Sequence, residues 1–164
     1  MLVQLFTSLF LSHSFAATAT IDFVARTNMP GVAVEGKSEN INVNYNSQKL
    51  SGSSFQFDVF DMKTGMDKRD QHLREKVFKA ENRGVAKIQF EANRLDCSSS
   101  CQLKGTLQIK DIKKEISMPV SISQDKKKIE GSAIVSLSDF NLPRPSFMGV
   151  KVENEVEIKF NLAE

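Results

Sequence analysis

The sequence predicts an all-β fold: an antiparallel up-and-down β-barrel of about eight strands, with one amphipathic helix that caps the barrel. Two observations favour this architecture. After residue 20, apolar and polar residues alternate through almost the whole chain, which is the period of half-buried strands. The links between the alternating segments are short, as in a meander, and closing a meander into a barrel removes its exposed edges.

The alternating segments supply the expected strands. They lie at 21–25, 41–45, 55–59, 88–92, 103–109, 116–122, 129–137 and 152–162. Because side chains of one parity point into a barrel, ten apolar residues are expected to line the interior and to contact any apolar ligand there. These residues are Phe55, Phe57, Val59, Phe90, Leu107, Ile109, Val120, Val135, Ile158 and Phe160.

The composition indicates a single globular domain. Of its 164 residues, 40% are hydrophobic and 26% are charged, so the chain is long enough for a core and is not disordered. Twelve Phe, one Tyr and no Trp favour an interior with few hydrogen-bonding groups. The net charge of +2 is too small and too evenly spread for a nucleic-acid binder, so no nucleic-acid partner is expected.

Residues 1–19 are expected to form a secretory signal peptide, which leaves residues 20–164 as the barrel domain. The apolar run from Leu2 to Phe15 is too short to span a bilayer, and small residues suited to signal peptidase follow it. The alternative is that this run is a short buried segment of the domain. With the signal removed, we expect a periplasmic or secreted protein without an integral membrane segment.

The two cysteines are expected to form a structural disulfide. Cys97 and Cys101 are separated by three serines that resemble the tip of a hairpin, and no second pair is present to complete a zinc site. If strands flank this tip, the two residues face each other across the hairpin end at a distance that a disulfide can bridge. Such bonds persist in exported proteins.

The most charged part of the chain predicts a helix from Met66 to Ala80. Helical spacing places Met66, Leu73, Val77 and Ala80 on one apolar face, with the charged residues mostly off it. Asp70 and Arg74 are expected to form an i,i+4 pair there. The narrow apolar face suits a helix that lies across one end of a barrel.

The same stretch raises the question of a metal or catalytic site, and we predict neither. Residues two apart on a helix point about 200° from each other, so Asp70 and His72 cannot share an ion. The sequence has no GxSxG motif that could supply a nucleophile to His72. The protein is therefore predicted to be a non-enzyme without a cofactor. Two interpretations of His72 stay open: hydrogen bonding to backbone at the barrel rim, or contact with a ligand head group.

Four segments resemble the YceI-like, lipid- and polyisoprenoid-binding family. They are the early VEGKSENINV, the charged stretch TGMDKRDQHLRE with the AKIQFEA that follows it, the hairpin LKGTLQIKDIKKEISMPV, and the closing SDFNLPRPSFMGVKVENEVEIKFNL. The resemblance covers nearly the whole mature chain. It implies a lipocalin-like barrel that holds a long apolar chain in its core.

Together these observations predict an exported binding or carrier protein for an isoprenoid-like lipid or another long-chain apolar lipid. The lipid tail is expected among the ten interior residues, and the head group at a barrel mouth within reach of Arg69, His72 or Arg144. The alternative is a structural or stress-related barrel with a filled core that acts through a protein partner. Assembly into oligomers is compatible with either function.

Overall fold

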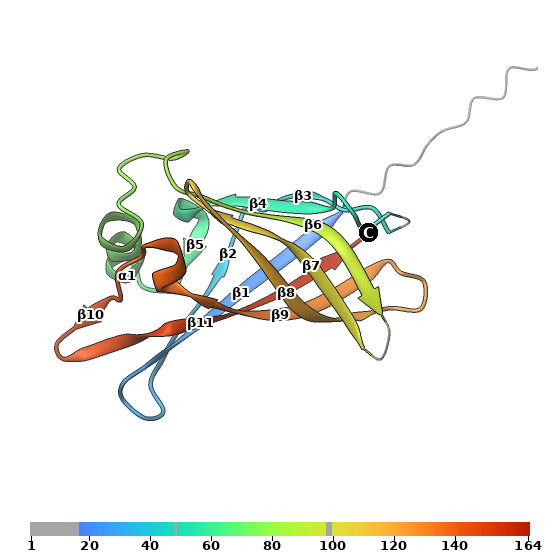
Figure 1. The fold of residues 1–164 in the computed structure, drawn as a ribbon. Coiled ribbons are helices and arrows are strands. Elements are labelled where there is room, and N and C mark those ends of the chain that lie inside the picture. Colours follow the sequence, from blue (N-terminus) through green and yellow to red (C-terminus); the bar gives the residue numbers. More distant parts are fainter. Residues whose placement is uncertain (1–16, 48, 98–99) are drawn as a thin grey trace, which may run out of the picture.

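The computed structural model describes residues 17–47, 49–97 and 100–164 (Figure 1). The strands are β1 (Thr18–Thr27), β2 (Ala33–Ser38), β3 (Asn42–Asn44), β4 (Ser54–Asp58), β5 (Met62–Lys63), β6 (Lys87–Cys97), β7 (Cys101–Ile109), β8 (Ile112–Ile122), β9 (Lys128–Ser136), β10 (Ser146–Phe147) and β11 (Val150–Ala163). The helical segments are α1 (Asp67–His72), the π-helical turn η2 (Leu73–Val77), and the 3₁₀ turns η1 (Val59–Asp61) and η3 (Leu137–Phe140).

The strands form one antiparallel barrel. Their order in the sheet is β3-β4-β6-β7-β8-β9-β11-β1-β2-β5. The two ends of this order are connected, because β3 continues from β2 along the chain and β5 continues from β4. β2 and β3 are consecutive parts of one run of chain, and β4 and β5, joined by η1, are consecutive parts of the next. The two runs form one kinked antiparallel hairpin, in which β3 pairs with β4 and β2 pairs with β5. Counted as continuous runs, eight strands follow one another, and the last, β11, pairs with the first, β1. The predicted up-and-down barrel is therefore confirmed.

The barrel wall is least continuous between β8 and β9. These strands pair only over Val120–Ile122 and Ile129–Gly131, although each is longer than this. Nearer the helix the two strands diverge, and η3 contacts both of them there. The 3₁₀ turn thus helps to close the wall on the side of α1.

β2 is the longest strand that the alternation did not reveal, because its inward positions are mostly small or polar. Val34, Gly36 and Ser38 face the interior, and only Val34 is a typical core residue. Gly36 lies opposite Phe23 on β1, and a Cβ built on Gly36 would lie 2.2 Å from the Phe23 ring. The ring therefore occupies the place that a larger residue on β2 would take.

The predicted helix is confirmed as a cap at one end of the barrel, in the form of α1 followed directly by η2 (Figure 1). Val77 and Ala80 are buried as predicted, and Leu73 is half-buried. The expectation for Met66 is wrong: it precedes α1 and is 53% exposed. The π turn carries a backbone hydrogen bond of 3.0 Å from the Phe78 N–H to the Leu73 carbonyl.

Asp70 also departs from the prediction. Its side chain is buried, and it accepts hydrogen bonds from the Thr64 backbone N–H at 2.8 Å and from the Thr64 hydroxyl at 2.6 Å. Arg74 does not pair with it but lies over the Phe60 ring, 5.2 Å from the ring centroid. A carboxylate that accepts two local hydrogen bonds can be buried at low cost. The helix is therefore fixed to the chain that precedes it.

A second polar cluster holds the kink of the barrel wall at η1. The buried Asp61 accepts a hydrogen bond of 2.8 Å from the Asn40 amide and bonds of 2.9 and 3.0 Å from the two terminal nitrogens of Arg83. Burial opposes ionisation, but the bonds from Arg83 and Asn40 and the Arg83 charge outweigh it, so the pKa of Asp61 lies below its ordinary value. The cluster joins the β2–β3 kink, η1 and the loop before β6.

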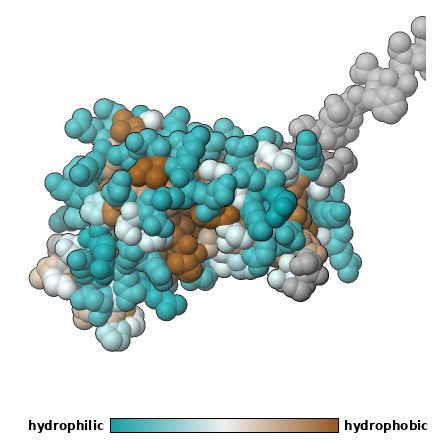
Figure 2. Space-filling view, viewed as in Figure 1, coloured by the Kyte–Doolittle hydropathy of each residue, from teal (hydrophilic) through white to brown (hydrophobic). Residues whose placement is uncertain are grey.

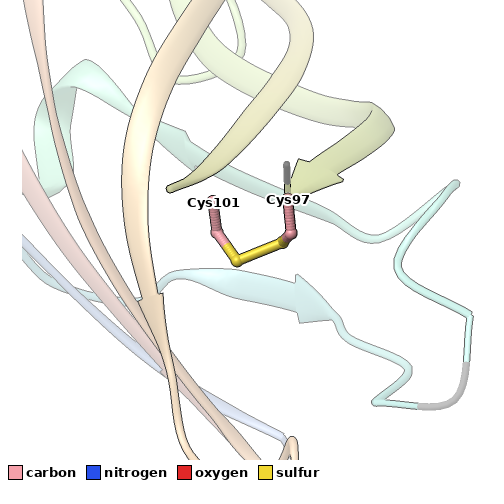
Figure 3. The surroundings of a disulfide bond; sticks show 2 residues. All are labelled: Cys97 and Cys101. Carbon is pink, nitrogen blue, oxygen red and sulfur yellow. A yellow bond between two sulfur atoms is a disulfide. The ribbon is translucent and has the colours of Figure 1, made fainter. Parts of the chain in front are cut away.

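The disulfide between Cys97 and Cys101 is present and closes the β6–β7 hairpin (Figure 3). The two residues are register partners, with their Cα atoms 4.0 Å apart. The β6–β7 hairpin ends at the end of the barrel opposite α1, the end at which the C-terminus also lies (Figure 1). Most of the expected signal peptide, residues 1–16, lies outside the described residues, while Thr18 and Ala19 already belong to β1. The signal peptide remains a prediction.

Candidate functional site

An apolar cavity of about 140 Å³ lies inside the barrel at the end that α1 covers. Its walls are inward-facing strand residues: Ile21, Phe23, Ala25, Val34, Ser38, Phe57, Met62, Ile88, Ile109, Val135, Val152, Val156 and Ile158. Its cap comes from the helix, from η3 and from their flanking segments: Thr64, Arg69, His72, Leu73, Val77, Phe78, Leu137, Leu142 and Pro145. Strand alternation supplies the walls, and the apolar face of the helix supplies part of the cap.

The polar residues around the cavity contribute almost no polar surface to it. The Thr64 hydroxyl is bonded to Asp70, and an Arg69 guanidinium nitrogen lies 2.9 Å from the sulfur of Met66. The Ser38 hydroxyl is buried and has no hydrogen-bond partner among the described residues. The cavity therefore suits an apolar group, with the charged part of Arg69 at its edge.

His72 is exposed while its side chain contributes to the cavity lining. Within the described part of the chain its imidazole forms no hydrogen bond, so the first of the two interpretations, a bond to backbone at the rim, is not seen there. His72 is thus a neighbour of the cavity without a structural hydrogen bond of its own.

Beyond the cavity the barrel interior is filled. The space among Phe55, Leu107, Met118 and their neighbours measures about 20 Å³, and a further space beside Tyr45 and Ile129 about 10 Å³. Phe55 packs against three other rings, with centroid distances of 5.4 Å to Phe90, 6.3 Å to Phe160 and 6.5 Å to Phe57. These rings form a plug between the cavity and the disulfide end.

The structure divides the thirteen residues for which we predicted ligand contact. Six of them line the cavity: Phe57, Arg69, His72, Ile109, Val135 and Ile158. Four lie in the filled region: Phe55, Phe90, Leu107 and Phe160. The other three lie elsewhere. Val59 is fully buried in the core, Val120 is half-buried against it, and Arg144 is exposed and donates a hydrogen bond of 2.9 Å to the Val152 carbonyl.

Several cavity residues were missed by sequence reasoning. Ile21, Phe23, Ala25, Val152 and Val156 belong to segments that the alternation did identify as strands, so their inward orientation was available as a signal. Leu142 and Pro145 come from an irregular segment after η3, where no periodicity indicates which side chains point inward. The parity of a strand predicts which side chains face inward but not which of them border empty space.

Other kinds of site find little support in the described residues. Over residues 17–47, 49–97 and 100–164, no three His, Cys, Asp or Glu side chains are grouped closely enough to hold a metal ion. Within the same ranges, no helix has the length and apolar character needed to cross a membrane.

Comparison with known proteins identifies the relatives of this fold. The family model of the YceI-like domain matches residues 13–163. BcnA from Burkholderia cenocepacia is 20% identical with a TM-score of 0.69, over 89% of this chain and 96% of that chain. A polyisoprenoid binding domain from Saccharophagus degradans is 12% identical with a TM-score of 0.57, over 88% and 91%. The Campylobacter jejuni YceI protein is 16% identical with a TM-score of 0.54, over 77% and 83%. None of the curated proteins matches. At these identities the structural matches show a shared fold.

Proposed function

The chain belongs to the YceI-like domain family, and from this premise and its cavity we propose that it binds the apolar chain of an isoprenoid-like lipid at the end of the barrel that α1 covers. The observation that carries the proposal is the almost wholly apolar lining of a cavity inside a barrel. Burying a methylene group in such a site contributes roughly 0.8 kcal/mol. The name of one structural relative, a polyisoprenoid binding domain, supports the same class of ligand.

The size of the cavity limits what it holds as it stands. Apolar cavities of roughly 150 Å³ take up molecules the size of benzene. The present volume of about 140 Å³ therefore fits one terminal unit of an isoprenoid chain. A longer chain requires that the rest of the tail leaves the cavity past the cap, or that the rings of the plug move aside.

The head group of such a lipid would lie outside the apolar lining, near the cap. Arg69 and His72 border the cavity, and Arg144 is adjacent to Pro145, which also borders it. An anionic or hydrogen-bonding head group suits these side chains. We further propose that the protein works outside the cytoplasm, as a carrier or store, on the basis of the expected signal peptide at residues 1–19.

The direct test is to purify the protein from its own host and to identify by native mass spectrometry and lipid extraction any apolar molecule that accompanies it. Binding of that molecule is then measured in Ala25→Leu, which adds apolar volume within the cavity. The matched control is Ala163→Leu, the same change on a β11 position next to the inward Leu162 and at the opposite end of the barrel. We expect Ala25→Leu to lower affinity at least about tenfold and the control to leave it unchanged.

A second candidate, a barrel that acts through a protein partner, is favoured by the filled half of the interior. Host-purified protein that carries no apolar molecule, together with an affinity for apolar probes that is equal in Ala25→Leu and the control, would reject the lipid proposal in favour of this one.

A further inference from the structure

Three segments surround the mouth of the barrel at the capped end, and we refer to them together as the rim surface. The first is residues 26–33, the β1–β2 turn with the strand ends beside it. The second is residues 63–69, from the end of β5 through the first half of α1. The third is residues 144–151, the tip of the β10–β11 hairpin with the two residues before β10. Figure 1 shows both hairpins projecting from the barrel at the end that carries α1. Arg69 and Pro145 of the rim surface also line the cavity.

The rim surface exposes apolar side chains at its outermost points. Met148 is 87% exposed, Met66 53%, Met29 47% and Val32 43%. In Figure 2 tan and white residues stand among the teal ones at the two projecting tips. Of the six large hydrophobic residues exposed in the described part of the chain, these four belong to the rim surface. Apolar residues concentrated in this way indicate an interaction site.

Met148 has a left-handed backbone conformation, which is unfavourable for a residue with a Met side chain. The two-residue turn between Phe147 and Val150 has positive φ at both Met148, +49°, and Gly149, +82°. Asn, Asp and Gly are favoured at the first position of such turns, and Met is not. An apolar side chain held at the tip of a hairpin against this preference points to a role for the side chain itself.

The two hairpin tips are held side by side. The Asn28 backbone N–H donates to the Lys151 carbonyl at 2.9 Å, the Lys151 N–H donates to the Asn28 side-chain oxygen at 2.7 Å, and the Asn28 amide donates to the Gly149 carbonyl at 3.4 Å. Thr27 bonds within its own turn, to the Val32 carbonyl, at 2.8 Å. The two hairpins that carry Met29, Val32 and Met148 are therefore fixed relative to each other by hydrogen bonds.

The rim surface is also strongly basic. Its three segments contain one acidic residue, Asp67, and six basic residues: Arg26, Lys63, Lys68, Arg69, Arg144 and Lys151. None of the six forms an ion pair with any residue that the structure describes. The whole chain has a net charge of only +2, so the remainder of the chain is net acidic. Positive charge is thus concentrated where the apolar tips project.

We propose that the rim surface docks the capped end of the barrel onto a bilayer that contains anionic phospholipids. Exposed apolar side chains next to unpaired basic residues are the combination that binds the interface of such a bilayer. Met29, Val32 and Met148 enter the headgroup region, and the basic side chains contact phosphates. Docking in this orientation places the cap of the cavity, which includes Arg69 and Pro145, at the bilayer, so a lipid that passes the cap moves between membrane and barrel without crossing water. This last step rests on the proposed lipid-binding function, whereas docking itself does not.

The test is flotation of the purified protein, signal peptide removed, with vesicles of phosphatidylcholine alone or mixed with phosphatidylglycerol. We expect binding to the mixed vesicles only, weakened by added salt. Met148→Asn removes the most exposed apolar side chain, suits the backbone of its turn, and should lower vesicle affinity about tenfold. Lys151→Ala should lower it about fivefold. The controls, Ile134→Asn on the barrel side and Lys49→Ala at the opposite end, should leave it unchanged.

Equal binding to both kinds of vesicle, or equal losses in Met148→Asn and Ile134→Asn, would overturn the docking proposal. A concentration-dependent dimer that Met148→Asn abolishes would overturn it in favour of a second copy of the chain as the partner. Ligand affinity in detergent separates docking from the cavity function: Met148→Asn should retain it, and Ala25→Leu should lose it while still binding vesicles. Vesicle binding without ligand binding in the wild type would mean that the lipid-binding proposal has failed. Ligand binding without vesicle binding would mean that the docking proposal has failed.

Discussion

The two ends of the barrel share the same strands but are filled differently. The end under α1 contains an interior cavity of about 140 Å³, whereas the interior spaces among the side chains toward the disulfide end measure only about 20 and 10 Å³. β11 shows the cause within one strand, because its inward side chains change from Val152 and Val156 at the hollow end to Phe160 and Leu162 at the filled end. On β11, smaller inward side chains thus lie where the barrel is hollow and larger ones where it is filled.

Glycines allow the filled end to pack this tightly. A Cβ on Gly105 would lie 2.3 Å from the ring of Phe90, and a Cβ on Gly131 would lie 2.6 Å from the ring of Phe160. Each ring thus lies against the backbone of a neighbouring strand, in the arrangement by which aromatic residues cover glycines in sheets. Close packing therefore leaves little interior room for a ligand at this end.

The largest effect is expected from Phe90→Ala, which removes a ring from the filled end. Phe90 is 2% exposed and stacks on Phe55, so the free energy of unfolding should fall by about 3–5 kcal/mol. The comparison is Val156→Ala at the hollow end, where less packing is lost and the cost should stay below about 1.5 kcal/mol. Urea unfolding measures both, and a loss in Val156→Ala as large as that in Phe90→Ala would show that the hollow end is packed at least as tightly as the filled end.

The fold was predictable because most inward strand positions carry large apolar residues, which makes the alternation visible. The alternation did not reveal β2, because its inward residues Gly36 and Ser38 are not apolar side chains. Gly36 is nevertheless part of the core packing, since the Phe23 ring lies where a Cβ on residue 36 would be. The burial of Asp70 escaped notice for a similar reason: its partner Thr64 becomes a neighbour only when the chain turns into α1.

The candidate site was predictable only in part. The parity of the strands correctly indicated that Phe55, Phe57, Phe90 and Phe160 point inward, since all four are buried in the core. Parity does not indicate height along the barrel, and only Phe57 of these four borders the cavity. Whether facing rings meet or leave space depends on the register of strands far apart in the sequence.

A matched pair of enlargements would sharpen the comparison. Ala92→Leu adds volume at the filled end, where the neighbouring space is only about 10 Å³, and should destabilise the fold by about 3 kcal/mol. Ala25→Leu makes the same change at the wall of the cavity and should be nearly neutral, because the added carbons enter existing space. Thermal or urea unfolding of both variants is the measurement. A large loss in Ala25→Leu would show that the cavity is not available space.

The disulfide stabilises the filled end locally. Replacing both Cys97 and Cys101 by Ser removes the cross-link from a very short loop, which should lower the free energy of unfolding by about 2 kcal/mol. The cavity is at the other end of the barrel, so affinity for an apolar ligand should not change. Unfolding and ligand titration of the variant are compared with those of the wild type with its disulfide intact. A change in ligand affinity as large as the change in stability would show that the two ends are coupled.

The smallest expected effect is the loss of stability at low pH that comes from Asp61 at the hollow end. There an ion pair with Arg83, and not a disulfide, fixes the barrel wall. Hydrogen bonds from Arg83 and Asn40 hold the pKa of Asp61 below its ordinary value of 3.8 despite its burial. A carboxyl with a depressed folded-state pKa contributes stability that is fully present above the unfolded-state value and is lost as the pH falls through the folded-state value. The Asp61 contribution should therefore be constant near neutral pH and disappear only below about pH 4.

The measurement is the free energy of unfolding against pH for the wild type and Asp61→Asn: the two curves should be separated near neutral pH and converge in acid. Parallel curves down to the lowest pH at which the protein folds would contradict this role for Asp61 and leave the kink of the wall to its backbone hydrogen bonds.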